Sequence, residues 1–416
     1  MRFLFLSQYW APEVGGAQAN LSAIVRELVR RGHEVEVVTA LPNYPKGRIF
    51  EGYRGRLYVR ENREGARIHR LWLYPAMGGG PARMANYASF ALSSLAGLAR
   101  VERPDWVFVE SPSLLLGLPA WILGRLHGCP FVFDVGDLWP DSIREMGLLR
   151  PGPVLAALEA LEAWTYRKAR FVLAATEGIH RALVERKGVP REKVIFFPSG
   201  VDTGRFRPLP RDPEWVRRID PGDRKVVLYA GNLGFAQGLE TVLEAMGLLR
   251  DRKDLLLVMV GDGSASGALQ DRARALGLDN VRFLPPVPEE EVPRLASLAF
   301  LGYAGLRDLP LFEGARPCKV VAYMACGLPV IFSGRGEVPR MLDRSGAGVA
   351  VPPEDPGALA RALVEAAEHP EAWARRGEAA RAWVEDRLSW EALVTRWLDC
   401  LEGRRPPPGP EDPGRE

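Results

Sequence analysis

Three turns in the chain carry residues whose types and spacing suit the binding of an anion. The first is Gly15-Gly16, where the absence of side chains lets a ligand approach the backbone. The second runs from Gly231 to Gly238 and contains Asn232 and Gln237. Each turn precedes an expected helix, whose first amide groups and positive dipole favour phosphate or sugar oxygens. A purely structural turn is the alternative interpretation of both sequences.

The third turn runs from Gly314 to Lys319 and leads into a helix that we expect over 320–326. Pro317 suits the first helical turn because its missing N–H would have had no partner there. Lys319 lies in the same opening turn, where the helix dipole mildly disfavours a cation. A lysine placed against that preference is easier to explain if it meets a phosphate. A solvated surface lysine is the alternative.

A carboxylate follows one buried strand directly. Asp137 comes after the expected strand 131–135, at the end of a strand where the catalytic groups of open α/β sheets collect. There it could accept the proton of a ligand hydroxyl group or orient that ligand. A cap of the next turn explains it equally well. Asp141, a little further along, suits a cap or an ion pair.

These residues belong to two copies of one design: a buried strand, a glycine-containing turn, an amphipathic helix and another strand. The first copy covers 2–39 and the second covers 225–260. Continuous apolar strands are typical of parallel sheets that are covered on both faces. The pattern predicts an α/β protein with two doubly wound, Rossmann-like domains facing each other across a cleft. Ligands of such sheets bind at the carboxyl ends of the strands.

The chain of 416 residues is too long for one hydrophobic core, so two domains are expected. A Pro- and Arg-rich passage at 206–213 breaks the strand and helix pattern and predicts the linker. We therefore expect an N-terminal domain over 1–205 and a C-terminal domain over 206–385. An amphipathic helix within 386–402 is expected to cross back onto the first domain. The segment 403–416, rich in Pro, Gly and charge, is expected to be disordered.

The composition is that of a soluble globular protein, with 47% hydrophobic and 26% charged residues. A net charge of +3 gives no argument for a nucleic-acid partner. The four cysteines and five histidines lack metal-ligand spacing, so we expect a reduced protein without a metal cofactor. The first strand begins at residue 2, too early for a signal peptide, and this favours a cytoplasmic location.

One stretch, Met84 to Ala99, carries little charge and is bordered by Arg83 and Arg100. It is shorter than the roughly 20 residues that a membrane-spanning helix needs. A core or interdomain helix is one interpretation. A helix that lies on a membrane surface, or against a lipid-linked ligand, is the other.

As a set, seven motifs resemble the GT-B glycosyltransferases of family 4. The resemblance is strongest to the bacterial surface-polysaccharide branch typified by N-acetyl-L-fucosamine transferases. The motifs follow the family's order and lie at 7–16, 42–48, 137–140, 200–202, 229–239, 260–263 and 317–327.

The resemblance implies a retaining glycosyltransferase of hexosyl or N-acetylhexosaminyl type that uses a nucleoside diphosphate sugar, which we expect to be UDP-linked. The second domain would hold this donor without a metal, and the first would hold the acceptor. Asn232 and Gln237 stand where many relatives carry an arginine and a lysine that hold the diphosphate, and this branch typically has the uncharged pair. Lys319 then becomes the main cation for the leaving diphosphate, and Asp137 is the second catalytic candidate.

The residues expected to contact the donor are glycines of the turns, side chains near them and the start of the 320–326 helix. They are Gly15, Gly16, Gly231, Asn232, Gln237, Gly238, Gly261, Glu313, Cys318, Val320 and Glu337. A loop-surface role is the alternative for Glu337.

The chain departs from the family at its Glu-x7-Glu element. The register places the second glutamate, expected to bind the ribose, at Ala322 and the first at Gly314, next to Glu313. Each lost hydrogen bond to a charged acceptor could cost about 1.5 to 3 kcal/mol. A non-catalytic sugar-nucleotide-binding protein with a divergent donor site is therefore one alternative. A nucleotide-sugar 2-epimerase shares the fold and is another, although its acidic and histidine-rich pattern is not evident.

Relatives of this kind often extend glycans on a polyprenyl diphosphate carrier. The resemblance therefore implies a glycan or polyprenyl-linked acceptor in capsular, envelope or lipopolysaccharide biosynthesis. It also implies peripheral contact with the inner face of the membrane, for which the Met84 to Ala99 stretch beside Arg83 is the candidate.

Overall fold

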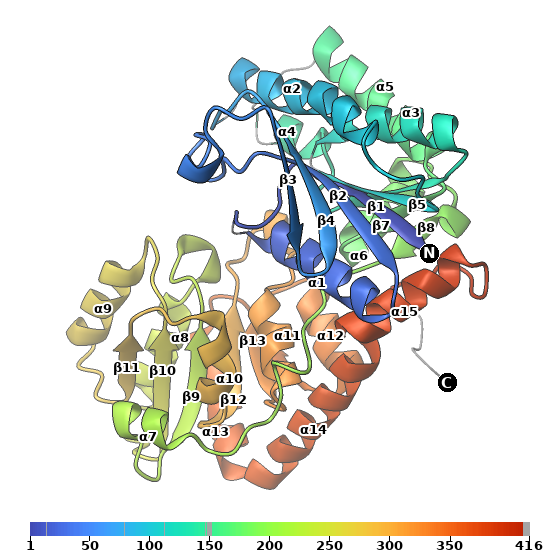
Figure 1. Ribbon diagram of the computed structural model, residues 1–416. Helices are drawn as coiled ribbons and strands as arrows, with labels where there is room; N and C mark the ends of the chain where they lie inside the picture. The colour runs from blue at the N-terminus through green and yellow to red at the C-terminus, as the bar shows by residue number, and fades with distance from the viewer. Residues whose placement is uncertain (14, 79, 112, 146, 148–151, 411–416) are drawn as a thin grey trace. The chain divides into compact units, whose positions relative to one another are not determined.

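The computed structural model describes residues 1–13, 15–78, 80–111, 113–145, 147 and 152–410, which form two compact units (Figure 1). Unit 1 comprises Met1–Ser199 and the segment that begins at Leu393, and unit 2 comprises Gly200–Ala392. The change of unit at 199/200 falls slightly before the predicted boundary at 205/206. The return to unit 1 falls inside the predicted crossing segment, 386–402.

Unit 1 contains an eight-stranded sheet with the order β3-β4-β2-β1-β5-β6-β7-β8. All neighbouring strands are parallel except β3 and β4. The inner strands are largely buried because both faces of the sheet are covered, and the central strand β1 is apolar from Phe3 to Leu6. The strands are β1 (Arg2–Leu6), β2 (Glu34–Ala40), β3 (Tyr58–Arg63), β4 (Ala66–Leu71), β5 (Trp106–Glu110), β6 (Phe131–Val135), β7 (Phe171–Ala174) and β8 (Val194–Phe196).

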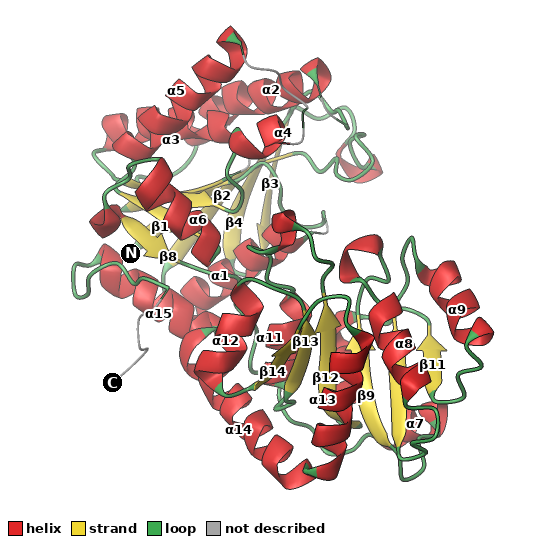
Figure 2. Cartoon of the chain, turned by 180° about the vertical axis from the view of Figure 1, so that it is seen from behind, coloured by secondary structure: helices red, strands yellow, loops and turns green. Residues whose placement is uncertain are grey.

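Helices cover this sheet on both faces: α2, α3 and α5 on one, and α1, α6 and α15 on the other (Figures 1 and 2). The α-helices are α1 (Gly16–Arg30), α2 (Pro81–Leu98), α3 (Gly117–His127), α4 (Asp141–Glu145), α5 (Pro153–Lys168), α6 (Glu177–Arg181) and α15 (Trp390–Leu401). Short turns of other helix types are η1 (Glu51–Tyr53), η2 (Leu114–Leu116), η3 (Ala182–Arg186) and η4 (Arg191–Lys193).

An aromatic cluster holds α15 on the unit 1 sheet. The ring of Trp397 lies 5.6 Å from those of Phe3 and Phe108, and 5.9 Å from that of Phe197, measured between centroids. Trp397 is buried. Burial of such a large side chain contributes strongly to docking, so the amphipathic pattern of this helix has its explanation in unit 1.

The chain beyond α15 corrects the predicted disorder of 403–416 in part. Residues 403–410 have described positions, and the backbone N–H of Phe196 donates a hydrogen bond of 2.8 Å to the carbonyl of Pro408. Phe196 belongs to β8, an edge strand whose free amides otherwise invite unwanted pairing. The segment therefore pairs with part of the edge of the sheet. Residues 411–416 lie outside the described residues.

Unit 2 contains a six-stranded parallel sheet with the order β11-β10-β9-β12-β13-β14. Its strands are β9 (Lys225–Ala230), β10 (Leu255–Val260), β11 (Val281–Leu284), β12 (Ala299–Gly305), β13 (Val330–Ser333) and β14 (Gly348–Val351). Its helices are α7 (Pro213–Ile219), η5 (Phe235–Gln237), α8 (Glu240–Leu248), α9 (Ser266–Ala275), η6 (Glu289–Glu291), α10 (Val292–Ala296), η7 (Pro310–Phe312), α11 (Cys318–Ala325), α12 (Glu337–Ser345), α13 (Pro356–Glu368) and α14 (Pro370–Arg387).

Side chains of β9 alternate between two hydrophobic clusters of unit 2. Val226 and Leu228 belong to one cluster, whereas Val227 and Tyr229 belong to the other. This is the period of two that a strand imposes on its side chains. Both faces of the sheet are therefore buried, and polar chemistry is left to the turns at the strand ends.

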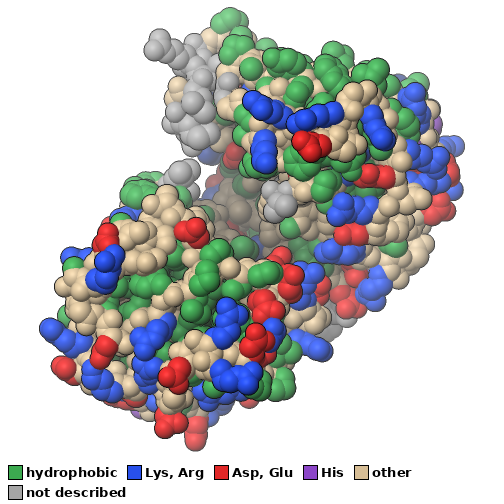
Figure 3. Space-filling model, turned by 60° about the vertical axis from the view of Figure 1, so that its left-hand side comes forward, with side chains coloured by type: hydrophobic (Ala, Val, Ile, Leu, Met, Phe, Trp, Pro, Cys, Tyr) green, Lys and Arg blue, Asp and Glu red, His purple; other side chains and the backbone are tan. Residues whose placement is uncertain are grey.

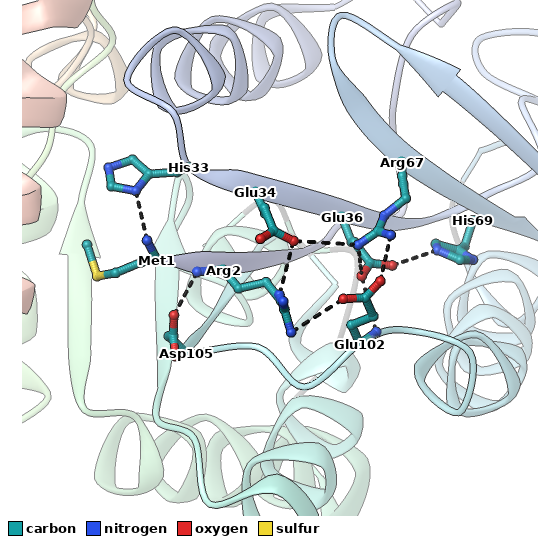
Figure 4. Close-up of polar contacts among 9 residues, drawn as sticks. All are labelled: Met1, Arg2, His33, Glu34, Glu36, Arg67, His69, Glu102 and Asp105. Carbon is teal, nitrogen blue, oxygen red and sulfur yellow. Dashed lines mark hydrogen bonds and ion pairs between the residues drawn. The ribbon is translucent and has the colours of Figure 1, made fainter.

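A network of charged groups occupies the amino-terminal end of the unit 1 sheet (Figure 4). Glu36 of β2 is buried and accepts hydrogen bonds from His69 and Arg67, each at 2.9 Å. Arg67 also pairs with Glu102. Because this network lies at the opposite end of the sheet from the carboxyl ends of the strands, we assign it to stability rather than to ligand binding.

Candidate active site

The turns that follow β9 and β10 touch each other in unit 2. Ala230 and Val260 are partners in the parallel ladder, so both strands end at the same level. Gly231 and Gly261 have φ angles of 141° and 147°, and a β carbon on Gly261 would lie 1.9 Å from the carbonyl oxygen of Gly231. Glycine at position 261 is therefore required by close backbone approach as well as by conformation.

The turn after β9 uses several of its own amide groups internally. The N–H of Gly231 donates to the carbonyl of Val260 at 2.9 Å, and that of Gly234 donates to the side-chain oxygen of Gln237 at 3.2 Å. The expected row of amide donors is therefore partly occupied. The N–H of Asn232 has no hydrogen-bond partner among the residues that the structure describes. Asn232 is exposed, so its N–H is available to a ligand.

Gln237 and Gly238 have structural roles in the same turn. Gly238 adopts the left-handed conformation, with φ 56°, and ends η5. Arg307 supports the turn from the neighbouring strand end: its guanidinium donates to the carbonyl of Phe235 at 2.8 Å and to Glu240 at 2.9 Å. Gln237, at the position where the family resemblance places a diphosphate-binding lysine, thus folds back onto the turn through its hydrogen bond with Gly234.

Lys319, in the first turn of α11, places its ammonium group beside the turn after β9. Its ammonium nitrogen, Nζ, donates a hydrogen bond of 2.5 Å to the hydroxyl of Tyr229 and lies 3.7 Å from the centroid of that ring. A β carbon on Gly231 would lie 3.0 Å from the same Nζ. No carboxylate oxygen of the described residues lies within 4.0 Å of it. Burial lowers the pKa of Lys319 to about 8.

The start of α11 adds backbone donors beside this ammonium group. Pro317 precedes the helix, and because its ring carries no acceptor atom it cannot cap the first amides. The N–H of Val320 donates a hydrogen bond of 3.0 Å to the carbonyl of Pro317, so this N–H is not available to a ligand, contrary to the expectation from the sequence. The amides of Cys318 and Lys319 have no partner within the described part of the chain. A cation without a counter-charge at an uncapped helix start is a site that suits an anion.

Glu313 and Glu337 contact each other through their backbones. The N–H of Glu337 donates to the carbonyl of Glu313 at 3.1 Å, and a β carbon on Gly336 would lie 1.9 Å from that oxygen. The carboxylate of Glu337 is buried and lies 3.7 Å from the buried guanidinium of Arg316. A loop-surface position for Glu337 is therefore wrong. The side chain of Glu313 is exposed.

Ala322 lies in α11, at the position where the family resemblance places a ribose-binding glutamate. Its methyl group is partly buried and packs against the hydrophobic cluster that contains Val320. At this position α11 therefore offers an apolar methyl group and no carboxylate.

Gly15 and Gly16 start α1 in unit 1. Gly15 is the residue before the helix, and because glycine has no side chain it cannot cap the first amides of the helix. A β carbon on Gly16 would meet no atom of the described residues within 4 Å, so the space beside it is open. The open space is compatible with the predicted approach of a ligand to this backbone. Val14 of the same turn lies outside the described residues.

Asp137 is exposed in the loop that follows β6, as the sequence predicts for a group that meets a ligand. Asp141 is buried and has a different role. Its carboxylate binds Lys187 at 3.0 Å, Arg186 at 2.5 Å and Arg144 at 3.3 Å. Asp141 therefore forms ion pairs, and it fixes the end of the loop that carries Asp137.

Two acids near the carboxyl ends of unit 1 strands were not identified in the sequence analysis: Glu110, which is buried, and Asp134, which is half-buried. Glu110 ends β5 and accepts a hydrogen bond from the hydroxyl of Ser7, and Asp134 is its partner on β6. Burial raises the pKa of Glu110 to about 8 and that of Asp134 to about 7. The available signal was a single acidic residue near the end of an otherwise apolar strand.

Tyr229 and Arg316 were not identified as site residues in the sequence analysis either. Tyr229 lies in a matched motif, but no property of the sequence shows that its hydroxyl reaches Lys319. Arg316 lies in the turn before α11, and the sequence does not show that it turns inward to Glu337. The structure brings Gly231, Asn232 and Lys319 together in unit 2. Gly15, Gly16 and Asp137 belong to unit 1.

The described residues contain no group of three or more His, Cys, Asp or Glu side chains that could hold a metal ion. No described helix combines the length and the apolar character that crossing a membrane requires.

Comparison with known families assigns both units. Residues 15–200 match the glycosyl transferase 4-like domain, and residues 213–383 match the domain of glycosyl transferases group 1. Together these matches span most of both units. The chain belongs to the GT-B glycosyltransferases, whose fold consists of two Rossmann-like domains.

Curated relatives match the chain over nearly its whole length. The putative colanic acid biosynthesis glycosyl transferase WcaI of Escherichia coli is 29% identical, over 97% of this chain and 100% of that protein. The GDP-mannose-dependent alpha-(1-6)-phosphatidylinositol monomannoside mannosyltransferase of Mycolicibacterium smegmatis is 27% identical, over 97% and 98%.

Solved structures confirm the fold class. HepE of Anabaena, solved in complex with UDP, matches with a TM-score of 0.72 and 16% identity, over 97% of this chain and 100% of that one. WaaG, a glycosyltransferase involved in lipopolysaccharide biosynthesis, matches with a TM-score of 0.64 and 17% identity, over 96% and 100%. At these identities the likeness concerns the fold alone.

Proposed function

We propose that the protein is a retaining glycosyltransferase that moves a hexose or an N-acetylhexosamine from a UDP-sugar to a glycan or lipid-linked acceptor of a surface polysaccharide. The observation that carries the proposal is Lys319, an ammonium group at the start of α11 with no carboxylate of the described residues within 4.0 Å. Such a group suits the diphosphate of a sugar donor.

Relatives support the class of substrate. WcaI is named for colanic acid biosynthesis, and HepE has been solved with UDP and with UDP-glucose. The mannosyltransferase relative is named as GDP-mannose-dependent. We propose UDP as the nucleotide, and a GDP-sugar is the competing donor that the experiment must include.

In the proposed reaction the bond between the anomeric carbon and the diphosphate breaks, and a bond to an acceptor hydroxyl oxygen forms. The leaving diphosphate gains negative charge as the bond breaks. Lys319 and the amides of Cys318 and Lys319 are positioned to stabilise that charge because they need not reorganise when it develops. We assign Asp137, exposed at the end of β6, to accept the proton of the acceptor hydroxyl or to orient the acceptor.

We also propose that α2 contacts the inner face of the membrane, where a polyprenyl-linked acceptor is held. Leu92 and Leu95 are 70% and 37% exposed on this helix, and Arg83 and Arg100 lie near its two ends. The face of unit 1 shown in Figure 3 gathers hydrophobic side chains beside Lys and Arg. Apolar and basic groups on one surface suit an anionic bilayer.

The test is incubation with a panel of UDP- and GDP-sugars, followed by measurement of free nucleoside diphosphate and of the sugar product. A glycosyltransferase releases the diphosphate slowly even to water, and faster with its acceptor. A 2-epimerase would interconvert donor sugars, and a non-catalytic protein would bind a donor unchanged. Either of these two outcomes would contradict the proposal.

A further inference from the structure

Tyr229 connects the cation of α11 to the turn after β9. Its side chain is fully buried, yet the hydroxyl reaches two polar groups at the surface of the core. It accepts the hydrogen bond from Nζ of Lys319 at 2.5 Å and donates one of 2.5 Å to the carbonyl of Asn232. One side chain therefore fixes the distance between Lys319 and the turn that carries the free N–H of Asn232.

The aromatic ring of Tyr229 holds the ammonium group without neutralising it. Nζ lies 3.7 Å from the ring centroid, a distance at which the face of an aromatic ring attracts a cation. A carboxylate in the same place would pair with Lys319 and cancel its charge. Burial raises the pKa of the Tyr229 hydroxyl, so this group stays neutral as well. The positive charge is thus held in place and left available to a ligand.

Within the described part of the chain, no carboxylate forms an ion pair with Lys319. Cys318 on α11 interacts with both Lys319 and Tyr229, whereas Tyr323 on α11 and Tyr303 on β12 interact with Tyr229. None of the three is a carboxylate or a basic group. Tyr323 uses its hydroxyl to accept the N–H of Ala230 at 2.6 Å. Tyr229 therefore gives Lys319 both its side-chain hydrogen bond and its cation–π contact.

We propose that Tyr229 is a positioning residue that presents the ammonium group of Lys319 to the diphosphate of the donor. The inference rests on the proposed function, since it names the residue that makes the same site effective. Tyr229 touches Lys319 and Asn232 rather than the reacting atoms. Loss of its hydroxyl is expected to release both the lysine and the turn from their common support.

The experiment compares Tyr229→Phe, which keeps the ring, with Tyr229→Leu, which removes ring and hydroxyl. Tyr303→Phe is the matched control, because its ring lies in the same cluster, 6.4 Å from that of Tyr229 between centroids, and makes no contact with Lys319. The affinity for UDP and for GDP is measured by calorimetry between pH 6.5 and 9.5, with melting temperatures and with KM and kcat for the donor.

We expect Tyr229→Phe to weaken nucleotide binding by about tenfold, which corresponds to about 1.4 kcal/mol. Tyr229→Leu should weaken it further, because this substitution also removes the aromatic ring that contacts the cation. Both substitutions remove groups that favour the charged form of Lys319. The pH above which UDP affinity falls should therefore move lower in both variants, and it should stay unchanged in Tyr303→Phe. A purely structural role would lower the melting temperature without moving this pH.

The two proposals fail in different ways. If Lys319→Ala weakens UDP binding while Tyr229→Phe keeps the wild-type affinity and pH dependence, the positioning role is wrong and the proposed function stands. If the wild-type protein binds neither UDP nor GDP, the proposed function fails and the positioning role fails with it. Should Tyr229→Leu not fold, the conservative Tyr229→Phe still decides the result.

Discussion

Gly261 passes so close to Gly231 that a β carbon on Gly261 would lie 1.9 Å from the Gly231 carbonyl oxygen. This contact joins the turns after β9 and β10 beside Lys319. Gly261→Ala must push the two backbones apart and also strain a φ of 147°. We expect a loss of unfolding free energy of about 1 to 3 kcal/mol and weaker nucleotide binding.

The control for this prediction is Gly267→Ala. Gly267 lies in α9, and a β carbon there would meet no described atom within 4 Å. Alanine in a helix is favoured over glycine by about 0.5 to 1 kcal/mol, so this variant should be as stable as the wild type or more so. Chemical denaturation measures both. Equal stability of Gly261→Ala and wild type would contradict the close approach.

Lys319 predicts a pH dependence of nucleotide binding. A bound diphosphate favours the charged amine, so UDP affinity should fall as the pH rises above about 8, the pKa that burial gives Lys319 in the free protein. Lys319→Ala should weaken binding by about 10- to 100-fold at pH 7. Lys319→Arg keeps its charge throughout this range, and its affinity should not change with pH.

The same group predicts how the stability of the unliganded protein changes with pH. The folded pKa of Lys319, about 8, lies below the ordinary 10.5, so between these values the unfolded chain binds more protons. Wild type should therefore gain stability relative to Lys319→Met as the pH rises from about 8 to 10.5. Denaturation at several pH values measures this difference. A constant difference would contradict a buried, uncompensated amine.

Asp137→Asn tests the second catalytic assignment. If the carboxylate accepts the acceptor proton, kcat should fall by about 10² to 10⁴ while the affinity for UDP stays the same, because UDP lacks the acceptor. Glu51→Gln changes another exposed acid of unit 1 and should leave kcat unaltered. A full rate in Asp137→Asn would remove Asp137 from the mechanism.

Glu36 predicts an acid-sensitive contribution to folding (Figure 4). Burial alone would raise the pKa of Glu36, but the hydrogen bond from His69, that from the N–H of Glu102 and the charge of Arg67 outweigh it and lower the pKa below 4.5. Such a group stabilises the fold above its unfolded pKa, and the contribution is lost as the pH falls through the folded pKa.

Glu36→Gln is therefore expected to lower the unfolding free energy by about 1 to 3 kcal/mol at pH 7, and by less as the pH approaches 3. Glu34→Gln removes an exposed neighbour, 59% accessible at its side chain, and should change stability by about 1 kcal/mol or less. Thermal unfolding at both pH values measures the two variants. If the effect of Glu36→Gln on stability does not become smaller toward low pH, the prediction that ionised Glu36 stabilises the fold would be wrong.

The sequence predicted the two α/β units and most strand positions because parallel strands in this chain are continuous apolar runs, such as 255–260, and such runs have few alternatives. It also identified Lys319 correctly as a cation at a helix start. It could not show which amides of the turns are used internally. That depends on contacts between β9 and β10, which are adjacent only in the folded sheet.

The same limit applies to inward-facing polar groups. Glu337 and Arg316 lie far enough apart in the chain that their burial against each other leaves no periodic signal. Tyr229 looks like any core aromatic residue of a strand, because the partner that gives it a polar role comes from α11. Local sequence patterns predict helices and strands. The site, in contrast, depends on pairs of residues that are distant in the sequence and come together only in the folded protein.

The exposed leucines of α2 carry the last prediction. Leu92 and Leu95 present apolar surface to solvent, and burying such groups in a bilayer is favourable in proportion to their area. Leu92→Glu with Leu95→Glu should abolish sedimentation with phosphatidylglycerol-containing vesicles. Leu248→Glu on α8, a residue 64% exposed in unit 2, is the control and should sediment like wild type. Raising the salt concentration should weaken binding of the wild type, because basic groups contribute. If the double variant sediments like wild type, or if neither protein sediments, then α2 is not the membrane contact. Donor hydrolysis is the control for folding: an unchanged rate in the double variant would show that its active site is intact.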